Sequence, residues 1–234
     1  MEFMLLLLQQ NLLMLLYLAA GYFLFKKKLV GEQGSADIGR MLLYLVMPTA
    51  ILKSYITDFS LEKLAGLGIS LLLSVLSLLL SMVLARVFFK PEENIERFGA
   101  AFSNAGFIGI PLVQMTMGSG AVFYVASYVA FLNILQWTYG VVLLSGDRST
   151  IRLKSLRTNP VILSFAAGIL LFLLPVTVPA IPLAFLSALA AMNGPLAMIV
   201  LGTYLAQTPL SSIFTEKIAY KCTAVRLVVI PAAG

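Results

Sequence analysis

Charged residues divide this chain into long apolar stretches, and no other feature of the sequence limits its fold as strongly. Only 11% of the 234 residues are charged, whereas a soluble domain has roughly 25%. Residues 98–146 and 158–215 contain no charge at all. A helix that crosses a membrane needs about 20 predominantly apolar residues, so each of these stretches is long enough for two helices. The pattern predicts an all-α polytopic membrane protein.

The apolar stretches divide into about eight transmembrane helices. Single helices are predicted at residues 3–25, 41–57, 64–87 and 218–234. Glycine and proline end regular helices. The stretch 98–146 is therefore divided into two helices at Gly118–Gly120, and the stretch 158–215 into two at the prolines within 175–182.

Lysine and arginine gather in every second loop of this arrangement. The loops after the first, third, fifth and seventh helices hold Lys26, Lys27, Lys28, Arg40, Lys90, Arg97, Arg148, Arg152, Lys154, Arg157 and Lys217. Cytoplasmic loops of membrane proteins are enriched in these residues. We therefore expect a multi-pass protein of the cell membrane, with its N-terminus outside and its odd-to-even loops in the cytoplasm. The net charge of +6 follows from this bias and does not indicate a nucleic-acid partner.

The residue counts disfavour several classes of function. The chain has no histidine and a single cysteine, Cys222, so the usual ligands of haem, zinc and iron–sulfur clusters are lacking. A Ser-His or Cys-His pair for nucleophilic catalysis cannot be built either. We therefore expect no metal, no cofactor and no catalytic residue, and we do not expect an enzyme.

The fourth predicted helix contains residues that disturb helical geometry, namely Ser103, Asn104, Gly106, Gly109 and Pro111. Pro111 removes a backbone donor and clashes with the preceding turn, while the glycines lower the cost of leaving the helix. Within a membrane, such a break persists only where protein or a water-filled cavity surrounds it. The N–H groups at the start of a half-helix suit an anion. We therefore expect two half-helices that meet at a substrate site near Pro111, with a simple proline kink as the alternative.

Other polar and proline positions are secondary candidates. Asn133 lies in the apolar fifth helix, where an interhelical hydrogen bond is its alternative role. Arg226 lies about 13 Å into the last helix, close to the middle of a ~30 Å hydrocarbon core. An arginine at that depth is a functional candidate. Helix breaks, or plain kinks, are expected at Pro48 and at Asn193, Gly194 and Pro195.

Two of these prolines indicate an internal repeat. Pro48 and Pro195 are 147 residues apart, and each lies in the second helix of a set if the sets begin at helices 1 and 6. Residues 1–146 then form a first five-helix set, 147–159 a cytoplasmic loop, and 160–234 a second set of three helices. An odd number of helices inverts the second set in the membrane. The sequence thus predicts an inverted repeat whose second copy is incomplete.

Four motifs carry a family resemblance. They are SNAGFIGIPL at residues 103–112, Arg157-Thr-Asn159-Pro160, Asn193-Gly-Pro195-Leu-Ala-Met, and Arg226-Leu-Val-Val-Ile-Pro231. With these motifs the chain resembles the auxin efflux carrier family, specifically its bacterial members. The resemblance implies ten helices in two inverted repeats, with broken helices 4 and 9 crossing in a transport domain that moves against a scaffold. It places Asn104 and the break at Pro111 in half of the crossing, and helices 9 and 10 are expected to be absent.

The resemblance also implies a function. Plant members export auxin, a carboxylate, and bacterial relatives resemble carriers of malate and malonate. We therefore expect a secondary transporter that moves small organic anions across the lipid bilayer by alternating access. The predicted substrate-site residues are Ser103, Asn104, Gly106, Gly109, Pro111, Asn133 and Arg226. Two alternatives stay open: a truncated, non-transporting membrane protein, which a homodimer could in principle complete, and a sodium-coupled carrier of bile-acid-symporter-like architecture.

Overall fold

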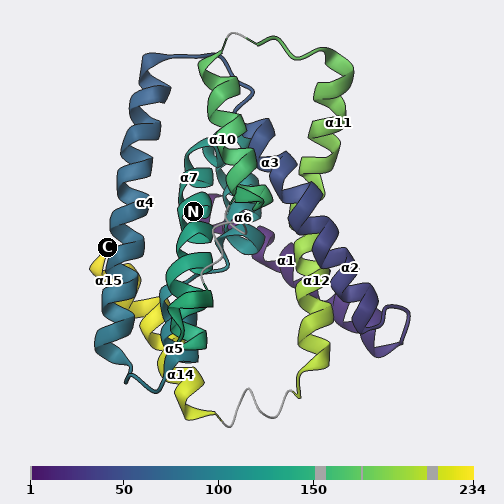
Figure 1. Cartoon of the computed structure of the whole chain (residues 1–234). Coiled ribbons are helices and arrows are strands. Elements are labelled where there is room, and N and C mark those ends of the chain that lie inside the picture. Colours follow the sequence, from purple (N-terminus) through teal and green to yellow (C-terminus); the bar gives the residue numbers. More distant parts are fainter. Residues whose placement is uncertain (1, 151–156, 175, 210–215) are drawn as a thin grey trace.

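The part of the chain that the structure describes is built from helices, without a strand. The computed structural model describes residues 2–150, 157–174, 176–209 and 216–234 (Figure 1). Within these ranges the helices form eight segments, which confirms the predicted all-α chain with about eight helices. Five segments are long and apolar enough to cross a membrane: Met4–Lys26, Glu32–Ser54, Leu61–Phe88, Gly120–Ser145 and Ala180–Gln207.

Several segments consist of more than one helical element. The first three are α1 (Glu2–Lys26), α2 with η1 and α3 (Glu32–Met41, Leu42–Val46 and Met47–Ser54), and α4 (Leu61–Phe88). The fourth is α5, η2 and α6 (Asn94–Ala101, Ala105–Gly109 and Ile110–Met117). The fifth is α7, η3 and α8 (Ser119–Leu135, Gln136–Gly140 and Val141–Ser145), which the short turn η4 (Arg148–Thr150) follows. The last three are α10 (Pro160–Leu173), α11 with α12 (Ala180–Ala191 and Asn193–Gln207), and α14 with η5 and α15 (Lys217–Ala224, Val225–Val229 and Ile230–Ala233).

The predicted divisions between segments agree with the structure. Gly118 separates α6 from α7 with φ of 85°, a conformation that glycine adopts at little cost. The division within residues 175–182 falls between α10 and α11. Pro175 lies outside the described residues, as do Arg152 and Lys154 of the predicted loop 147–159.

The second segment begins earlier than the charge pattern predicted. It starts at Glu32 rather than at residue 41, and its first helix, α2, carries charged side chains. Asp37 and Arg40 form an exposed ion pair at 2.8 Å on this helix. These charges lie on an exposed face and do not have to be buried. The helix can therefore begin before the apolar stretch does.

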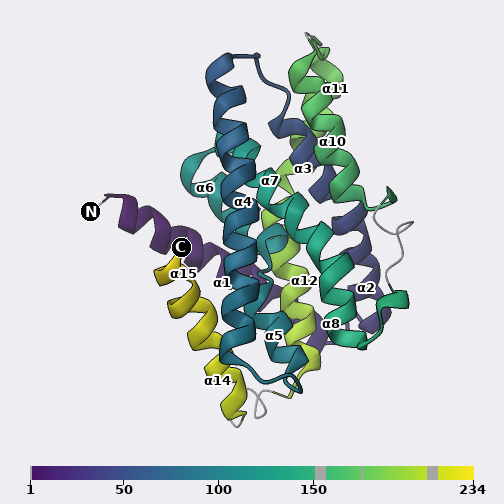
Figure 2. The ribbon, with the colours of Figure 1, turned by 60° about the vertical axis from the view of Figure 1, so that its left-hand side comes forward.

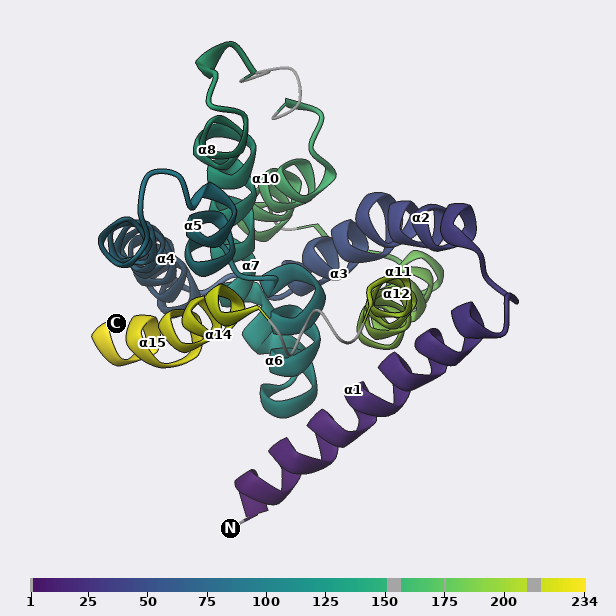
Figure 3. The same cartoon turned by 90° about the horizontal axis from the view of Figure 1, so that it is seen from below.

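The segments alternate in direction, as expected of a multi-pass membrane protein. The C-terminal ends of α1, α4 and α12 lie at one end of the molecule, and those of α3 and α10 lie at the other (Figure 1). Figure 2 shows α1 running obliquely to α4 and α12, and Figure 3 shows it crossing one side of the bundle. The predicted loops after the first, third and seventh helices therefore share one end.

Close helix packing depends on glycines at two crossings. α1 packs against α12, where a Cβ on Gly202 would lie 2.0 Å from the carbonyl oxygen of Leu18. α10 packs against α3, where a Cβ on Gly168 would lie 2.6 Å from the ring of Tyr55. In membranes, such small residues let helix backbones approach closely and gain van der Waals contact.

Three of the prolines that lie within helical segments follow π-helical turns. Pro48, Pro111 and Pro231 each follow a five-residue π-helical turn after one intervening residue. The residue before each proline donates its N–H to a carbonyl five residues back, as Met47 does to Leu42. The wider turn makes room for the proline ring, which in an α-helix clashes with the fourth carbonyl back. The break expected at Pro48 is thus a π turn in a continuous helix.

Serine hydroxyl groups join α4 to α7. The Ser70 hydroxyl donates to the carbonyl of Tyr124 at 2.7 Å and lies 2.8 Å from the hydroxyl of Ser127. Ser74 lies 3.1 Å from the same Ser127 hydroxyl. These contacts fix α7, which carries Asn133, against the long helix α4.

Candidate functional site

The fourth segment is interrupted between α5 and η2. Phe102, Ser103 and Asn104 are not helical, and Asn104 has φ of −85° and ψ of 55°. The side-chain oxygen of Asn104 accepts the N–H of Phe107 at 3.4 Å and caps the next helix. Serine and asparagine favour such positions because their side chains compete with backbone hydrogen bonds. The interruption expected at Pro111 therefore lies earlier, at these capping residues, and Pro111 lies in the first turn of α6.

A cavity of about 320 Å³ lies at this interruption. Three segments line it: α2–η1–α3 with Leu43 and Met47, α5–η2 with Phe98, Phe102, Ser103, Asn104, Gly106 and Phe107, and α7–η3 with Leu132, Asn133 and Gln136. The structure thus brings four predicted site residues together: Ser103, Asn104, Gly106 and Asn133. Cavities that bind small molecules start at about 300 Å³ and combine apolar walls with a few polar groups, as this one does.

Two of the polar side chains also have partners in the protein. The Ser103 hydroxyl lies 3.3 Å from the hydroxyl of Tyr128. The Asn133 amide donates to the carbonyl of Val129 at 2.9 Å, and its oxygen accepts from the Asn159 amide at 3.4 Å. Asn133 therefore makes the interhelical hydrogen bond that was its alternative role, while it also lines the cavity.

The two half-helix ends at the cavity favour an anion. η2 begins there and continues into α6, and the N-terminal end of a helix carries partial positive charge. α5 ends there, and its negative end is offset by Arg226, whose Nη1 donates to the carbonyls of Ala100 at 2.7 Å and Ala101 at 3.3 Å. No charged side chain occurs among the described residues that line the cavity. The arrangement therefore suits a small anion better than a cation.

A comparison with family models assigns the chain to a group of membrane proteins. Residues 7–154 and 148–234 match the family described as membrane transport protein. The chain belongs to this family. The resemblance to auxin efflux carriers seen in the sequence is confirmed, and with it a multi-pass protein of a transporter family that is generally non-enzymatic. No curated protein matches the chain.

In this membrane transport protein, Gly106 also has a packing role, whereas Gly109 and Pro111 lie outside the cavity lining. A Cβ on Gly106 would lie 2.9 Å from Cε of Met47, so the glycine permits close contact between η2 and α3. A Cβ on Gly109 would meet only the Cβ of Ala105, at an ordinary 3.4 Å. Pro111 is buried. Neither Gly109 nor Pro111 is among the residues that line the cavity.

The residues Asn193, Gly194 and Pro195 form the first turn of α12. Met192 alone separates them from α11, and its φ of −71° and ψ of −16° stay in the right-handed helical region. The expected break is therefore a kink. Asn193 is fully buried, and neither its amide nitrogen nor its oxygen has a hydrogen-bond partner among the described residues. Leaving such a group unpaired costs about 1–3 kcal/mol.

Seven cavity residues were not among the predicted site residues: Leu43, Met47, Phe98, Phe102, Phe107, Leu132 and Gln136. Gln136 had a usable signal, because it lies three residues after Asn133 and such residues share a helix face. Met47 also had a usable signal, because it directly precedes Pro48, at which the sequence predicted a break or kink. The three phenylalanines do not differ from other apolar residues of the spans.

Proposed function

We propose that this membrane transport protein is a secondary transporter that moves small organic anions by alternating access. The observation that carries the proposal is the cavity at the interrupted fourth segment. There Ser103 and Asn104 line the same cavity as the amides of Asn133 and Gln136. An interruption of this kind within a membrane segment is typical of transporter substrate sites.

The chemistry of the cavity supports a small carboxylate, such as malonate or malate, as the substrate. Amide and hydroxyl groups provide donors for carboxylate oxygens, and the side chains of Phe98, Phe102 and Phe107 provide an apolar wall. The start of η2 adds partial positive charge, while Arg226 offsets the negative end of α5. These donors and the partial positive charge favour an anion over a cation.

The helix packing supports a five-helix inverted repeat as the framework of the transporter. The first helix of one set packs on the second helix of the other in both directions, α1 on α12 and α10 on α3. Gly21 faces the backbone of α12 and Gly168 faces α3. These two glycines are 147 residues apart, the same spacing as Pro48 and Pro195. Reciprocal packing at a constant spacing is what two copies of one unit would produce.

The basic residues support a cytoplasmic location for the loops after α1, α4 and α12. The helix ends at α1 and α4 share one end of the molecule with the end of α12 (Figure 1). Lys26, Lys27 and Lys28 at the end of α1, and Lys90 after α4, belong to this end. By the positive-inside rule it faces the cytoplasm, and the N-terminus then lies outside.

Uptake by reconstituted protein tests the function. Proteoliposomes with the wild-type chain are expected to accumulate radiolabelled malonate, and Asn104→Ala is expected to abolish this uptake while leaving the protein folded. The reason is that the substitution removes both a substrate contact and the cap of η2. Far-UV circular dichroism reports whether the variant keeps its helices.

Asn11→Ala is the matched control. Asn11 is an exposed residue of α1 whose amide bonds the carbonyl of Leu7 in its own helix. This variant is expected to keep wild-type uptake. Uptake that is equal in the Asn104→Ala and Asn11→Ala proteins would contradict the proposed site.

A further inference from the structure

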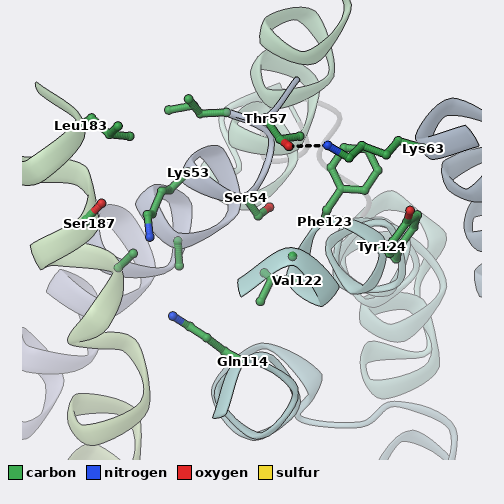
Figure 4. A pocket seen from close by; sticks show the side chains of 14 residues that line it. Lys53, Ser54, Thr57, Lys63, Gln114, Val122, Phe123, Tyr124, Leu183 and Ser187 are labelled. Carbon is green, nitrogen blue, oxygen red and sulfur yellow. Dashed lines mark hydrogen bonds between the residues drawn. The ribbon is translucent and has the colours of Figure 1, made fainter. Parts of the chain in front are cut away.

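A second, larger cavity lies toward the opposite end of the bundle. It has a volume of about 650 Å³ and is bounded by α3, the α3–α4 loop, α4, α6, α7 and α11. Its lining includes Lys53 of α3, Lys63 of α4, Gln114 of α6 and Ser187 of α11 (Figure 4). The first cavity has no charged lining residue in the described part of the chain, whereas this one has two lysines.

Three polar side chains from different helices converge in this cavity. Figure 4 shows the amine of Lys53 and the amide of Gln114 pointing into the same space, with the hydroxyl of Ser187 beside them. Lys53 is half-buried and close to the outer end of its helix, where a lysine usually extends its amine to bulk solvent. Here the amine points into the cavity. Amine, amide and hydroxyl groups are all hydrogen-bond donors, so the cluster suits an anionic oxygen.

The positive charge of this cavity is not neutralised by ion pairs. Lys63 donates to the hydroxyl of Thr57 at 2.6 Å and to the carbonyl of Asp58 at 3.0 Å, which are both uncharged acceptors. Among the described residues, the only ion pairs are Asp37 with Arg40 and Glu93 with Lys221, so neither cavity lysine takes part in one. Asp58 and Glu62 are exposed and are not lining residues. An anion that enters the cavity therefore meets uncompensated positive charge.

The two cavities are consecutive along the same helices. On α3, Met47 lines the first cavity and Ala50 the second. Along η2 and α6, Gly106 lines the first and Gln114 the second, eight residues or about 12 Å farther along the helix. The layer between the cavities includes the fully buried Ile110.

The neighbouring helix α7 repeats this pattern. Tyr124 lines the second cavity and Leu132 the first. Ala126 and Val129, which lie between them, are fully buried. A thin, fully buried layer thus separates two polar cavities, as expected if both lie on one path through the bundle.

We infer that this second cavity is a separate binding site for a small carboxylate, with Lys53 as its principal contact and Gln114 and Ser187 as further donors. This inference rests on the proposed function, because it makes the cavity the opposite mouth of the organic-anion path. Its wall of Val122, Phe123 and Leu183 accommodates the apolar part of such an acid.

Chemical protection of lysines tests the site without any transport assay. The purified chain in phosphatidylcholine nanodiscs is treated with an amine-acetylating reagent, with and without malonate, and each lysine is quantified by mass spectrometry. Malonate is expected to slow acetylation of Lys53 and to leave Lys217, an exposed residue outside the cavity, unchanged. The same protection is expected in the Asn104→Ala protein, because the two sites are separate.

Affinity for radiolabelled malonate gives the second measurement. Lys53→Gln is expected to weaken binding at this site about tenfold, which corresponds to the loss of roughly 1.4 kcal/mol from one charge-assisted hydrogen bond. Lys53→Arg keeps the charge and is expected to keep the affinity. Lys217→Gln is the control for a lysine outside the cavity.

The outcomes separate this site from the proposed function. Unchanged acetylation of Lys53 with malonate and unchanged affinity in Lys53→Gln would overturn the site, even if uptake depends on Asn104. Loss of Lys53 protection in Asn104→Ala would overturn its independence from the first cavity. If phosphatidylglycerol protects Lys53 and malonate does not, the lysine binds lipid headgroups and the site is refuted. Protection without any Asn104-dependent uptake would support the site while contradicting the proposed function.

Discussion

Replacing Arg226 with methionine tests how the half-helix α5 is held at the cavity. Nη1 of Arg226 donates to the last carbonyls of α5, those of Ala100 at 2.7 Å and Ala101 at 3.3 Å. Methionine has a similar apolar stem but no donor and no charge. In Arg226→Met both carbonyls lose this partner, and the negative end of α5 is no longer offset.

The magnitude follows from these two contacts. A hydrogen bond to a charged group contributes about 1.5–3 kcal/mol, and the favourable charge at a helix end is part of that value. We take about 2 kcal/mol for the loss, which corresponds to about a 30-fold change in an equilibrium constant. The affected equilibrium is the separation of α14 and η5 from α5.

The only cysteine of the chain reports this separation directly. Cys222 lies on α14 with its Sγ 3.6 Å from the carbonyl of Glu96 in α5, and a Cβ on Gly99 of α5 would meet that sulfur at 3.4 Å. Cys222 is partly exposed in the packed state as well. The rate at which N-ethylmaleimide labels Cys222 is therefore expected to rise by up to about 30-fold in Arg226→Met, because the part of the labelling that needs opening follows the open population when opening is fast. Mass spectrometry over time measures this rate.

A variant on the same helix provides the control. Lys221 forms a partly exposed ion pair with Glu93 at 3.9 Å, and its amine lies 4.6 Å from the ring centroid of Phe89. Such contacts contribute about 1 kcal/mol or less, so Lys221→Met is expected to change labelling less than about fivefold. Equal labelling rates in Arg226→Met and Lys221→Met would refute the capping role of Arg226.

Three further substitutions test the packing at and around the site. Gly106→Val is expected to reduce malonate uptake strongly and to destabilise the protein by about 1–3 kcal/mol, because the valine side chain would collide with Met47 of α3. Gly109→Ala is the control and should behave as wild type. Normal uptake by the Gly106→Val protein would disprove the tight contact. Gly202→Ala should lower the melting temperature clearly, since its Cβ would lie 2.0 Å from the carbonyl oxygen of Leu18, and an unchanged melting temperature would speak against the α1–α12 crossing. Asn193→Leu is expected to raise the free energy of unfolding by about 1–2 kcal/mol, because an unpaired buried amide is removed, and a destabilised variant would mean that the amide has a partner.

The sequence predicted the membrane class and the order of the segments because charge and apolar length are local signals. Gly118 is an example: a Gly-Ser-Gly sequence within an apolar stretch marks a turn, and the structure has its positive φ there. The position of the interruption in the fourth segment was missed for an equally local reason. Pro111 was the stronger signal, but a π turn compensates for it, while the capping side chain of Asn104 interrupts the helix.

Two further features were not predicted. One of them, the similarity between the two sets of helices, had a usable sequence signal, and the other, the partners of Arg226, had none. Ala19-Ala20-Gly21 and Ala166-Ala167-Gly168 lie at the same 147-residue spacing as the two prolines, so the sequence match between the sets could have been found. Arg226 was recognised as an arginine within the membrane. Its partners are carbonyls of α5 more than 100 residues away, and backbone carbonyls leave no trace in a sequence. The pairing of Arg226 with these carbonyls could therefore be recognised only from the three-dimensional structure.

The π turns before the prolines determine how the insertion or deletion of one residue would affect the helix that follows. A π turn holds one residue more than the α-helical turn it replaces, and one residue corresponds to about 100° of rotation around the helix axis. A single helical wheel drawn through residues 32–54 is therefore out of phase on the two sides of η1. Deleting one residue of η1 would restore regular periodicity and turn all of α3 by that angle, which would take Lys53 away from Gln114 and Ser187. The extra residue in η1 thus sets which face of α3 lies toward the second cavity.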